Sequence, residues 1–367
     1  MSEQREATMA SLDLLGPVAD LTAALLDIES VSGNEAAVAD AVEAALLGLP
    51  HLSVLRDGDA IVARTNLGRA QRVVLAGHLD TVPLPTTPGS RGTVPSTWDG
   101  DTLFGRGAVD MKGGVAVQLA IAARLLEPNS DVTFVFYDHE EVEASLSGLG
   151  RLVDHHPELL TDADFAILLE PTDGAVEGGC NGTSRFRVTT TGKAAHSARA
   201  WMGENAIHKA APILARLAQH EPATINVDGL EYRESLNAVR INGGVAGNVI
   251  PDFCEVEVNY RFAPSRSIED ADAYVRALLE GFDIERTDAA SGARPGLDVP
   301  AAASFVAAVG AEAKPKYGWT DVARFSELGI PAVNFGPGDP LLAHSDNEHV
   351  SRQAVQDCLD ALLRWLA

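Results

Sequence analysis

Residues 72–80 have the sequence Arg-Val-Val-Leu-Ala-Gly-His-Leu-Asp, an apolar β-prone run that ends on His78 and Asp80. Two later segments repeat this design: residues 132–137 precede Asp138 to Glu141, and residues 165–169 precede Glu170. Apolar runs of this kind, alternating with helical segments, predict strands covered on both faces in a largely parallel sheet. Ligands bind beyond the carboxyl ends of such strands, so we expect a site where these polar residues meet.

A fourth apolar run, residues 330–335, is followed through a glycine turn by His344. Asp110 lies in the glycine-rich stretch Leu-Phe-Gly-Arg-Gly-Ala-Val-Asp-Met-Lys-Gly-Gly, residues 103–114. A single acidic residue before a helix is usually an N-cap. Because other ligand-type residues follow the strands, we expect Asp110 to bridge two metal ions instead.

The pattern changes between residues 181 and 293, where alternating strands and two amphipathic helices follow in the order strand, helix, two strands, helix. This order predicts an inserted α+β domain of ferredoxin-like type. Residues 1–180 and 294–367 would form the α/β catalytic domain, with a mixed, largely parallel sheet flanked by helices. A chain of 367 residues is long enough for two such domains.

The amino-acid composition excludes some classes of binding partner. The formal net charge of −24 argues against binding to nucleic acid or to an anionic membrane surface. Cys180, Cys254 and Cys358 lie far apart, so neither a disulfide framework nor a thiolate zinc site is predicted. Residues 1–10 carry charges and lead into no long apolar stretch, so we expect no signal peptide, no membrane span and a cytoplasmic protein.

Two local motifs carry specific expectations. Ser32 followed by Glu35 has the form of a capping box, which predicts a helix from about Asn34. In His78-x-Asp80, one imidazole nitrogen can bind a metal while the other donates to the carboxylate of Asp80.

Glu140 and Glu141 are adjacent, so their carboxylates point in different directions. One of them can bind metal while the other stays available as a base. The alternative is an exposed acidic loop, because Asp138 and Glu143 extend the run of charges. Imidazole and carboxylate ligands without thiolates suit zinc, with cobalt or manganese as substitutes.

Together, these segments resemble the co-catalytic zinc hydrolases, a family that includes succinyl-diaminopimelate desuccinylases, acetylornithine deacetylases, aminoacylases and glutamate-releasing carboxypeptidases. The resemblance covers nearly the whole chain. It is carried by residues 77–83, 105–114, Glu140-Glu141, Glu170-Pro171-Thr172, residues 192–197, 248–251 and 344–348.

The resemblance implies roles for individual residues. His78, Asp110 and Glu170 would hold one zinc, and Asp110, Glu141 and His344 the other. Glu140 would be the general base and Asp80 would orient His78, with a cis peptide bond after Asp110. His196, which could otherwise be a plain surface residue, would stabilise the oxyanion in a partner's active site. Residues 181–293 would then be a lid and dimerisation domain, and the protein a homodimer.

The expected reaction is hydrolysis of an N-acyl amino acid, most closely N-succinyl-L,L-2,6-diaminopimelate, to give succinate and L,L-diaminopimelate. Acetylornithine deacetylation, or hydrolysis of another N-acyl amino acid, is the alternative within the family. A noncatalytic binding protein is the rival from another class, and Glu140 argues against it because a binder needs no base. Candidates for binding the substrate are Arg261, Asn248, Thr320 and Thr183.

Other arginines, among them Arg185, Arg199 and Arg324, could equally form structural ion pairs. The sequence also departs from the usual desuccinylase pattern Gly-Gly-Thr-Ser-Asp, because Gly318-Trp319-Thr320-Asp321 contains a bulky indole and one residue fewer. This departure affects the shape of the expected substrate pocket and therefore the acyl group that it accepts.

Overall fold

The computed structural model describes residues 12–367. Residues 1–10, in which no leader was expected, lie outside the described residues. The described chain forms two compact units: the first contains residues 12–177 together with Gly296–Lys314 and Arg324–Ala367, and the second contains Gly178–Pro295 and Pro315–Ala323. Each unit is described separately below.

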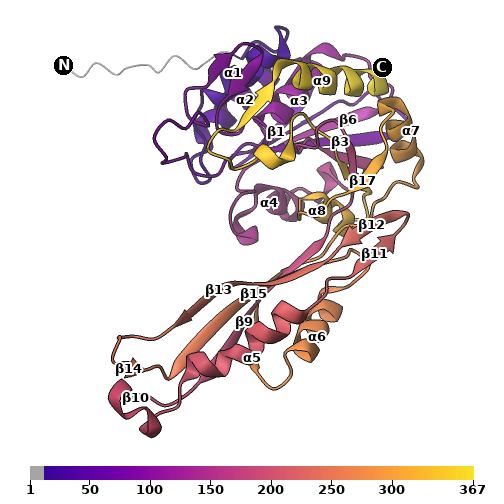
Figure 1. The fold of residues 1–367 in the computed structure, drawn as a ribbon. Helices are drawn as coiled ribbons and strands as arrows, with labels where there is room; N and C mark the ends of the chain where they lie inside the picture. The colour runs from indigo at the N-terminus through magenta and orange to yellow at the C-terminus, as the bar shows by residue number, and fades with distance from the viewer. Residues whose placement is uncertain (1–11) are drawn as a thin grey trace, which may run out of the picture. The chain divides into compact units, whose positions relative to one another are not determined.

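The first unit is built on an eight-stranded sheet with the order β1-β2-β6-β3-β7-β18-β8-β17 (Figure 1). Its strands are β1 (Ser53–Asp57), β2 (Ala60–Arg64), β3 (Arg72–His78), β6 (Asp131–Tyr137), β7 (Phe165–Leu168), β8 (Val176–Gly178), β17 (Ala313–Pro315) and β18 (Ala332–Asn334). Strands β6, β3, β7 and β18 are parallel neighbours, whereas β1 and β2 form an antiparallel hairpin that pairs with β6. The sheet is therefore mixed and largely parallel, as the sequence predicted.

Helices cover this sheet because its central strands are apolar on both faces; β6 is buried at every position. The helices are α1 (Val18–Leu26), α2 (Ala36–Leu47), α3 (Lys112–Arg124), α4 (Gly148–His155), α7 (Pro300–Val309), α8 (Val322–Glu327) and α9 (Arg352–Leu366). One large core joins α1, α3 and α9 to the side chains of β3, β6 and β7 on one face. A small sheet of β4 (Thr97–Asp99), β5 (Thr102–Phe104) and β19 (His349–Ser351) brings the C-terminal segment beside the segment before α3.

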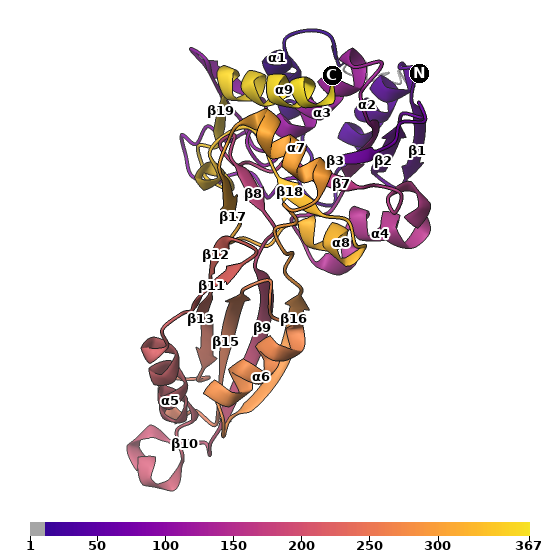
Figure 2. The ribbon, with the colours of Figure 1, turned by 90° about the vertical axis from the view of Figure 1, so that its right-hand side faces the viewer.

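The second unit contains a four-stranded antiparallel sheet in the order β13-β15-β9-β16, with α5 (Ala206–Gln219) and α6 (Ile268–Leu278) packed on it (Figure 2). The strands are β9 (Gly182–Thr191), β13 (Ser235–Gly243), β15 (Phe253–Phe262) and β16 (Asp283–Ala290). Strands β11 (Thr224–Val227) and β12 (Leu230–Arg233) form a hairpin, and the short strands β10 (Ala195–His196) and β14 (Val249–Ile250) form a separate antiparallel pair. Buried and accessible residues alternate along β9 and β15, as in a sheet covered on one face.

The second unit also takes in Pro315–Ala323, which the sequence alone placed with residues 294–367. Hydrogen bonds explain this placement. The N–H of Asn181 donates to Lys316 O, and Trp319 Nε1 donates to Ser291 O at 3.0 Å.

The predicted capping box at Ser32 and Glu35 is wrong. Helix α2 begins at Ala36 without a side-chain cap. The Ser32 hydroxyl instead donates to Asp80, and the Glu35 carboxylate accepts the N–H of Gly33. A true capping box occurs at α6, between Ser267 and Asp270. Within residues 12–367, no helix has the length and apolar character to cross a membrane.

Candidate metal centre

Residues that follow four parallel strands of the first unit come together at the carboxyl edge of the sheet. His78 is the last residue of β3, and Glu141 and Glu170 follow β6 and β7 in neighbouring positions. His344 comes after β18, at the end of a turn through Gly336 and Gly338. Because these strands are parallel and adjacent, their ends meet in space although their residues are far apart in sequence.

Asp110 lies between the two histidines. Its Oδ1 is 3.1 Å from His78 Nε2, and its Oδ2 is 3.2 Å from His344 Nε2. His344 Nε2 is also 2.9 Å from Glu141 Oε1, and His78 Nε2 is 4.0 Å from Glu170 Oε1. The two oxygens of one carboxylate therefore face two separate groups of ligand-type atoms.

The electrostatics favour a cation at this position. Hydrogen bonds that His344 donates to Asp110 and to Glu141 raise its pKa to about 10. Burial favours the neutral form of His78, but hydrogen bonds to Asp110 and Asp80 outweigh it and raise its pKa well above the usual value. Both pKa shifts arise from the neighbouring carboxylates, so the site is strongly negative and attracts a cation. Potential ligand atoms of His78, Asp110 and Glu141 all lie within 4.8 Å of one another, so the donor set fits a divalent metal.

Asp80 links the histidine to the acidic pair. His78 Nδ1 lies 2.9 Å from the main-chain carbonyl of Asp80 and 3.5 Å from its carboxylate, so the carbonyl is the closer partner. The carboxylate accepts the N–H groups of Glu140 at 3.0 Å and Glu141 at 3.1 Å, and the Ser32 hydroxyl at 2.7 Å. Burial opposes its ionisation, but His78, the Glu140 N–H and the Ser32 hydroxyl together lower the pKa of Asp80 to about 2. An ionised Asp80 therefore fixes both adjacent glutamates through their backbones.

A second network supports the same loop, and sequence reasoning missed it. His139 has a left-handed backbone with φ of 57°, which turns the chain immediately before Glu140. Its Nδ1 lies 2.7 Å from Asp138 Oδ2, and Asp138 Oδ1 accepts Arg151 Nη2 at 2.6 Å. Glu35 accepts the His139 N–H at 3.3 Å. The positive φ of His139 has no sequence signature, and the Ser32 to Glu35 pattern was attributed to helix capping.

Two glycines allow the close packing around Asp110. Gly107 has φ of +85°, and a Cβ on it would lie 2.8 Å from Thr81. A Cβ on Gly114 in α3 would lie 2.3 Å from the carbonyl of Leu169, the residue before Glu170. The peptide bond between Asp110 and Met111 is cis, as the resemblance implied.

The predicted substrate-binding and oxyanion residues all lie in the second unit. Thr183 and Arg261 are directly paired between β9 and β15, and Arg261 Nε donates to Asn259 at 3.1 Å. His196 and Asn248 lie together instead at the antiparallel pair of β10 and β14, where Ser197 N–H donates to the Asn248 carbonyl. Both of these side chains are exposed.

Thr320 is buried, and its carbonyl faces the Cys180 thiol at 3.7 Å. Trp319, the departure from the desuccinylase pattern, is fixed by its indole hydrogen bond to Ser291.

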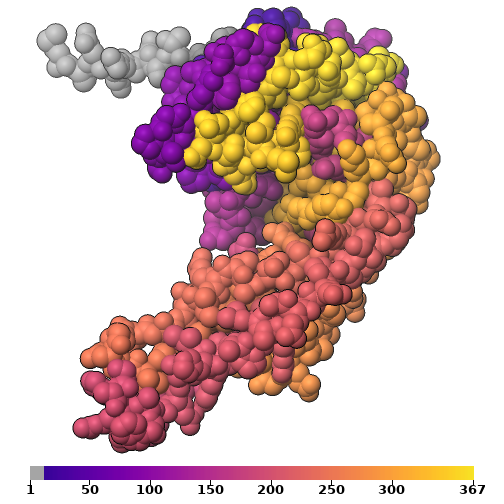
Figure 3. All heavy atoms as spheres, in the orientation of Figure 1, coloured from indigo at the N-terminus to yellow at the C-terminus, as the bar shows by residue number. Residues whose placement is uncertain are grey.

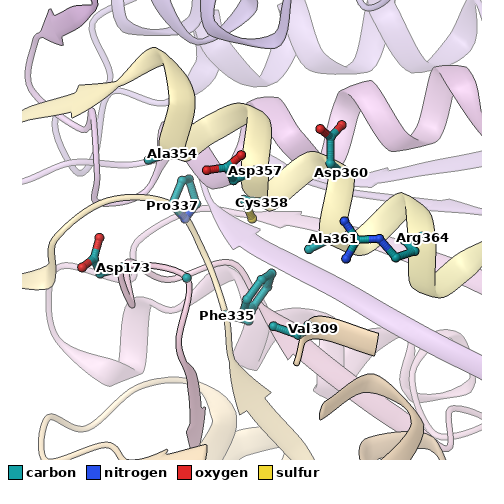
Figure 4. Close-up of a pocket in the computed structure, with 11 residues that line it drawn as sticks. Asp173, Val309, Phe335, Pro337, Ala354, Asp357, Cys358, Asp360, Ala361 and Arg364 are labelled. Atoms are coloured by element: carbon teal, nitrogen blue, oxygen red, sulfur yellow. The ribbon is translucent and has the colours of Figure 1, made fainter. Parts of the chain in front are cut away.

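A separate pocket of about 380 Å³ lies beside α9 in the first unit (Figure 4). Asp357, Asp360 and Arg364 reach it from α9, and Phe335 and Val309 supply apolar surface. None of the predicted site residues lines this pocket, so it does not define the candidate centre.

Residues 74–367 match the model of peptidase family M20/M25/M40. The chain belongs to this family and is a metal-dependent hydrolase. It is 45% identical over 367 residues to the succinyl-diaminopimelate desuccinylase of Corynebacterium glutamicum, covering 97% of this chain and 98% of that protein. It is 52% identical over 358 residues to a Mycobacterium tuberculosis protein provisionally named succinyl-diaminopimelate desuccinylase DapE, covering 97% and 99% of the two chains.

Solved structures show the same fold at lower identity. A metallo-carboxypeptidase of Sulfolobus solfataricus has a TM-score of 0.78 at 16% identity, with 95% of this chain and 98% of that chain covered. A tripeptidase of Staphylococcus aureus has a TM-score of 0.76 at 20% identity, with coverage of 97% and 98%.

Proposed function

We propose that this enzyme hydrolyses N-succinyl-L,L-2,6-diaminopimelate to succinate and L,L-diaminopimelate in cytoplasmic lysine and diaminopimelate biosynthesis. The observation that carries the proposal is the similarity, at 52% and 45% identity over almost the whole chain, to two proteins named for this activity. The convergence of the acidic and histidine side chains in the first unit supports the hydrolytic chemistry.

The proposed cofactors are two zinc ions. His78, Asp110 and Glu170 would hold one of them, and Asp110, Glu141 and His344 the other, with Co²⁺ or Mn²⁺ as substitutes. When bound, such a pair polarises an amide carbonyl and lowers the pKa of a shared water toward ~7.

Glu140 is the proposed proton carrier. Its backbone N–H is held by Asp80, so its position is fixed relative to Glu141 next to it. At neutral pH a carboxylate can accept the proton of the attacking water and later donate it to the leaving amine. Asp80 is the proposed positioning residue for this step.

The second unit supplies groups that suit a substrate with several carboxylates. Thr183, Arg185, Asn259 and Arg261 share one face of the β9–β15 pair, opposite the face covered by α5 and α6. Arginine binds carboxylates bidentately, so we assign Arg261 and Thr183 to substrate binding, with Arg185 on the same face. Asn248 and Thr320 are the further proposed contacts.

The proposed site is completed by a second copy of the chain. Arg261 lies eight positions after Phe253 along β15, a span of about 26 Å, and His196 and Asn248 lie beyond the Phe253 end. Figure 1 shows β10 and β14 at that end of the sheet, and Figure 2 shows β10 there. One substrate molecule is too short to contact His196 and Arg261 of the same chain, so we propose a homodimer in which His196 acts on the partner's substrate.

An edge strand of the second unit offers a surface for this dimer. Strand β13 lies at the edge of its sheet and exposes Val239 (57%) and Ile241 (47%). An edge strand with exposed apolar residues pairs readily with another chain.

A substrate panel tests the proposed function. The zinc-loaded enzyme is assayed with N-succinyl-L,L-diaminopimelate, N-acetylornithine and N-acetyl-L,L-diaminopimelate, and kcat/KM is compared. We expect the succinyl substrate to be preferred. A preference for acetyl substrates would replace the proposal with acetylornithine deacetylase or another N-acyl amino acid hydrolase. Absence of turnover with every substrate, in a metal-loaded protein, would favour a binding protein.

A further inference from the structure

Glu348 is a buried glutamate whose carboxylate binds the loop that ends at Asp110. It lies just before β19 and is 1% exposed. Its Oε2 accepts the Gly107 N–H at 3.0 Å and Arg106 Nη1 at 2.8 Å. Its Oε1 accepts the N–H groups of Val109 at 3.1 Å and Asp110 at 3.2 Å. One carboxylate thus binds three backbone donors and a guanidinium of the same short loop.

These donors need the carboxylate because the loop belongs to no helix or strand. Residues 105–110 connect β5 to α3, and the buried N–H groups of Gly107, Val109 and Asp110 find their acceptor in Glu348. A buried N–H group without an acceptor is unfavourable, so the loop would move if the carboxylate were lost. The position of the Asp110 side chain depends directly on this backbone.

Arg106 connects the same loop to the segment that carries His344. Its Nη1 donates to the Ser345 carbonyl at 3.2 Å as well as to Glu348. The N–H of Gly105 donates to the Glu348 carbonyl at 3.1 Å. Figure 3 shows the C-terminal segment, in yellow, against the purple segment near residue 90, where the Gly92 N–H donates to the Asp346 carbonyl.

We propose that Glu348, together with Arg106, is a positioning residue that holds Asp110 and His344 at the separation required for metal binding. Glu348 touches neither carboxylate nor imidazole of the centre, so it acts through the backbone of Asp110 and through Ser345. The proposal rests on the metal-ligand roles assigned above but not on the identity of the substrate. Groups that orient metal ligands typically contribute 10- to 100-fold to metal affinity.

The chain contains a matched control. Glu234 is 3% exposed and accepts the Ala263 N–H at 3.0 Å and Arg266 Nε at 2.7 Å, all within the second unit. A glutamine at Glu234 or at Glu348 keeps the shape of the side chain but turns one acceptor into a donor. Both variants lose stability, but only Glu348→Gln removes support from the metal centre.

The test is a Zn²⁺ titration of the metal-free protein in competition with a chromophoric chelator, at a temperature where circular dichroism shows each variant folded. We expect Glu348→Gln to weaken Zn²⁺ binding by roughly 10- to 100-fold, and Glu234→Gln to leave the affinity unchanged. Wild-type affinity in folded Glu348→Gln, or equal weakening in Glu234→Gln, would overturn the proposal.

If Glu348→Gln does not fold, the same Zn²⁺ titration of Arg106→Lys tests the proposal. A lysine keeps the charge but cannot bridge Glu348 and Ser345 with the same geometry. Weaker Zn²⁺ binding by folded Arg106→Lys supports the proposal, and unchanged binding overturns it. The titration uses no substrate, so it gives an answer even if the proposed desuccinylase activity is not found.

Discussion

Glu140 and Glu141 are neighbours in sequence with different proposed tasks. The backbone of each is held by the same carboxylate, Asp80, and the side chain of Glu141 lies 2.9 Å from His344. A change at Glu140 should therefore affect proton transfer without removing a metal ligand.

Glu140→Gln should retain its bound metal and lose about 10²- to 10⁴-fold in kcat, because the amide cannot accept a proton. Metal content by mass spectrometry and steady-state kinetics measure the two effects. Glu143→Gln, in the same acidic run but exposed, is the control and should behave as wild type. Substantial turnover by Glu140→Gln would remove Glu140 from the mechanism.

Metal binding should release protons. Both His78 and His344 have raised pKa values in the metal-free protein, that of His344 to about 10, whereas a histidine ligand must be neutral. At pH 7.5 we expect about two protons per chain to be released, and about one in His344→Ala. Calorimetric titration in buffers of different ionisation enthalpy counts them. No proton release would contradict the charged state of these histidines.

The raised pKa of His344 also determines how the stability of the metal-free protein changes with pH. Since the folded-state pKa of His344 exceeds its usual value of 6.5, its contribution to stability is fully present below pH 6.5. The contribution is lost as the pH rises through about 10. Metal affinity changes in the opposite direction and increases over this range.

The site residues that follow the strands could be predicted from the sequence. The residues that hold those site residues in place could not. His78, Glu141 and Glu170 come directly after apolar runs, so their meeting follows from strand order. Glu348 accepts distant backbone N–H groups and Ser32 donates to the distant carboxylate of Asp80, and no local pattern encodes such contacts. Ser32 was misjudged for this reason, since its spacing to Glu35 also matches a capping box.

At the level of elements, strand β13 carries the next prediction. Ile241→Lys places a charge on this exposed edge and should shift the protein toward a monomer. Because each proposed site then loses the partner's His196, kcat should fall about 10²-fold at concentrations where the monomer dominates. Light scattering after gel filtration gives the oligomeric state.

Asp283→Lys, on the opposite edge strand β16, is the matched control and should leave the oligomeric state unchanged. A wild-type enzyme that is monomeric and fully active at assay concentration would exclude the dimer mechanism.

Regular elements could be predicted because apolar periodicity determines them. The parallel strands β3, β6, β7 and β18 lie where the apolar runs of the sequence placed them. The segment Pro315–Ala323 was not predictable, because Trp319 and Lys316 attach it to the second unit through contacts with Ser291 and Asn181 that lie more than twenty residues away.

At the level of the whole molecule, the proposed dimer predicts complementation between two inactive variants. Glu140→Gln supplies an intact His196, and His196→Ala supplies an intact base. If His196 acts across the dimer, a heterodimer of the two has one complete site and should recover about half of the wild-type turnover per dimer. Co-expression with two affinity tags and tandem purification isolates it.

The control is each variant purified as a homodimer, which should remain inactive. An inactive heterodimer, despite confirmed pairing, would place His196 in the same chain as the site it serves.

The two histidines of the centre differ greatly in accessibility: the His78 side chain is 1% exposed, whereas that of His344 is 51% exposed. A chelator can approach the ion beside His344 from solvent, but the ion beside His78 can leave only after the surrounding strand ends open. Removal of the metal ions by a chelator should therefore proceed in two kinetic phases, with a one-metal intermediate that time-resolved metal analysis can detect. Loss of both ions in a single phase would show that they leave by a common route.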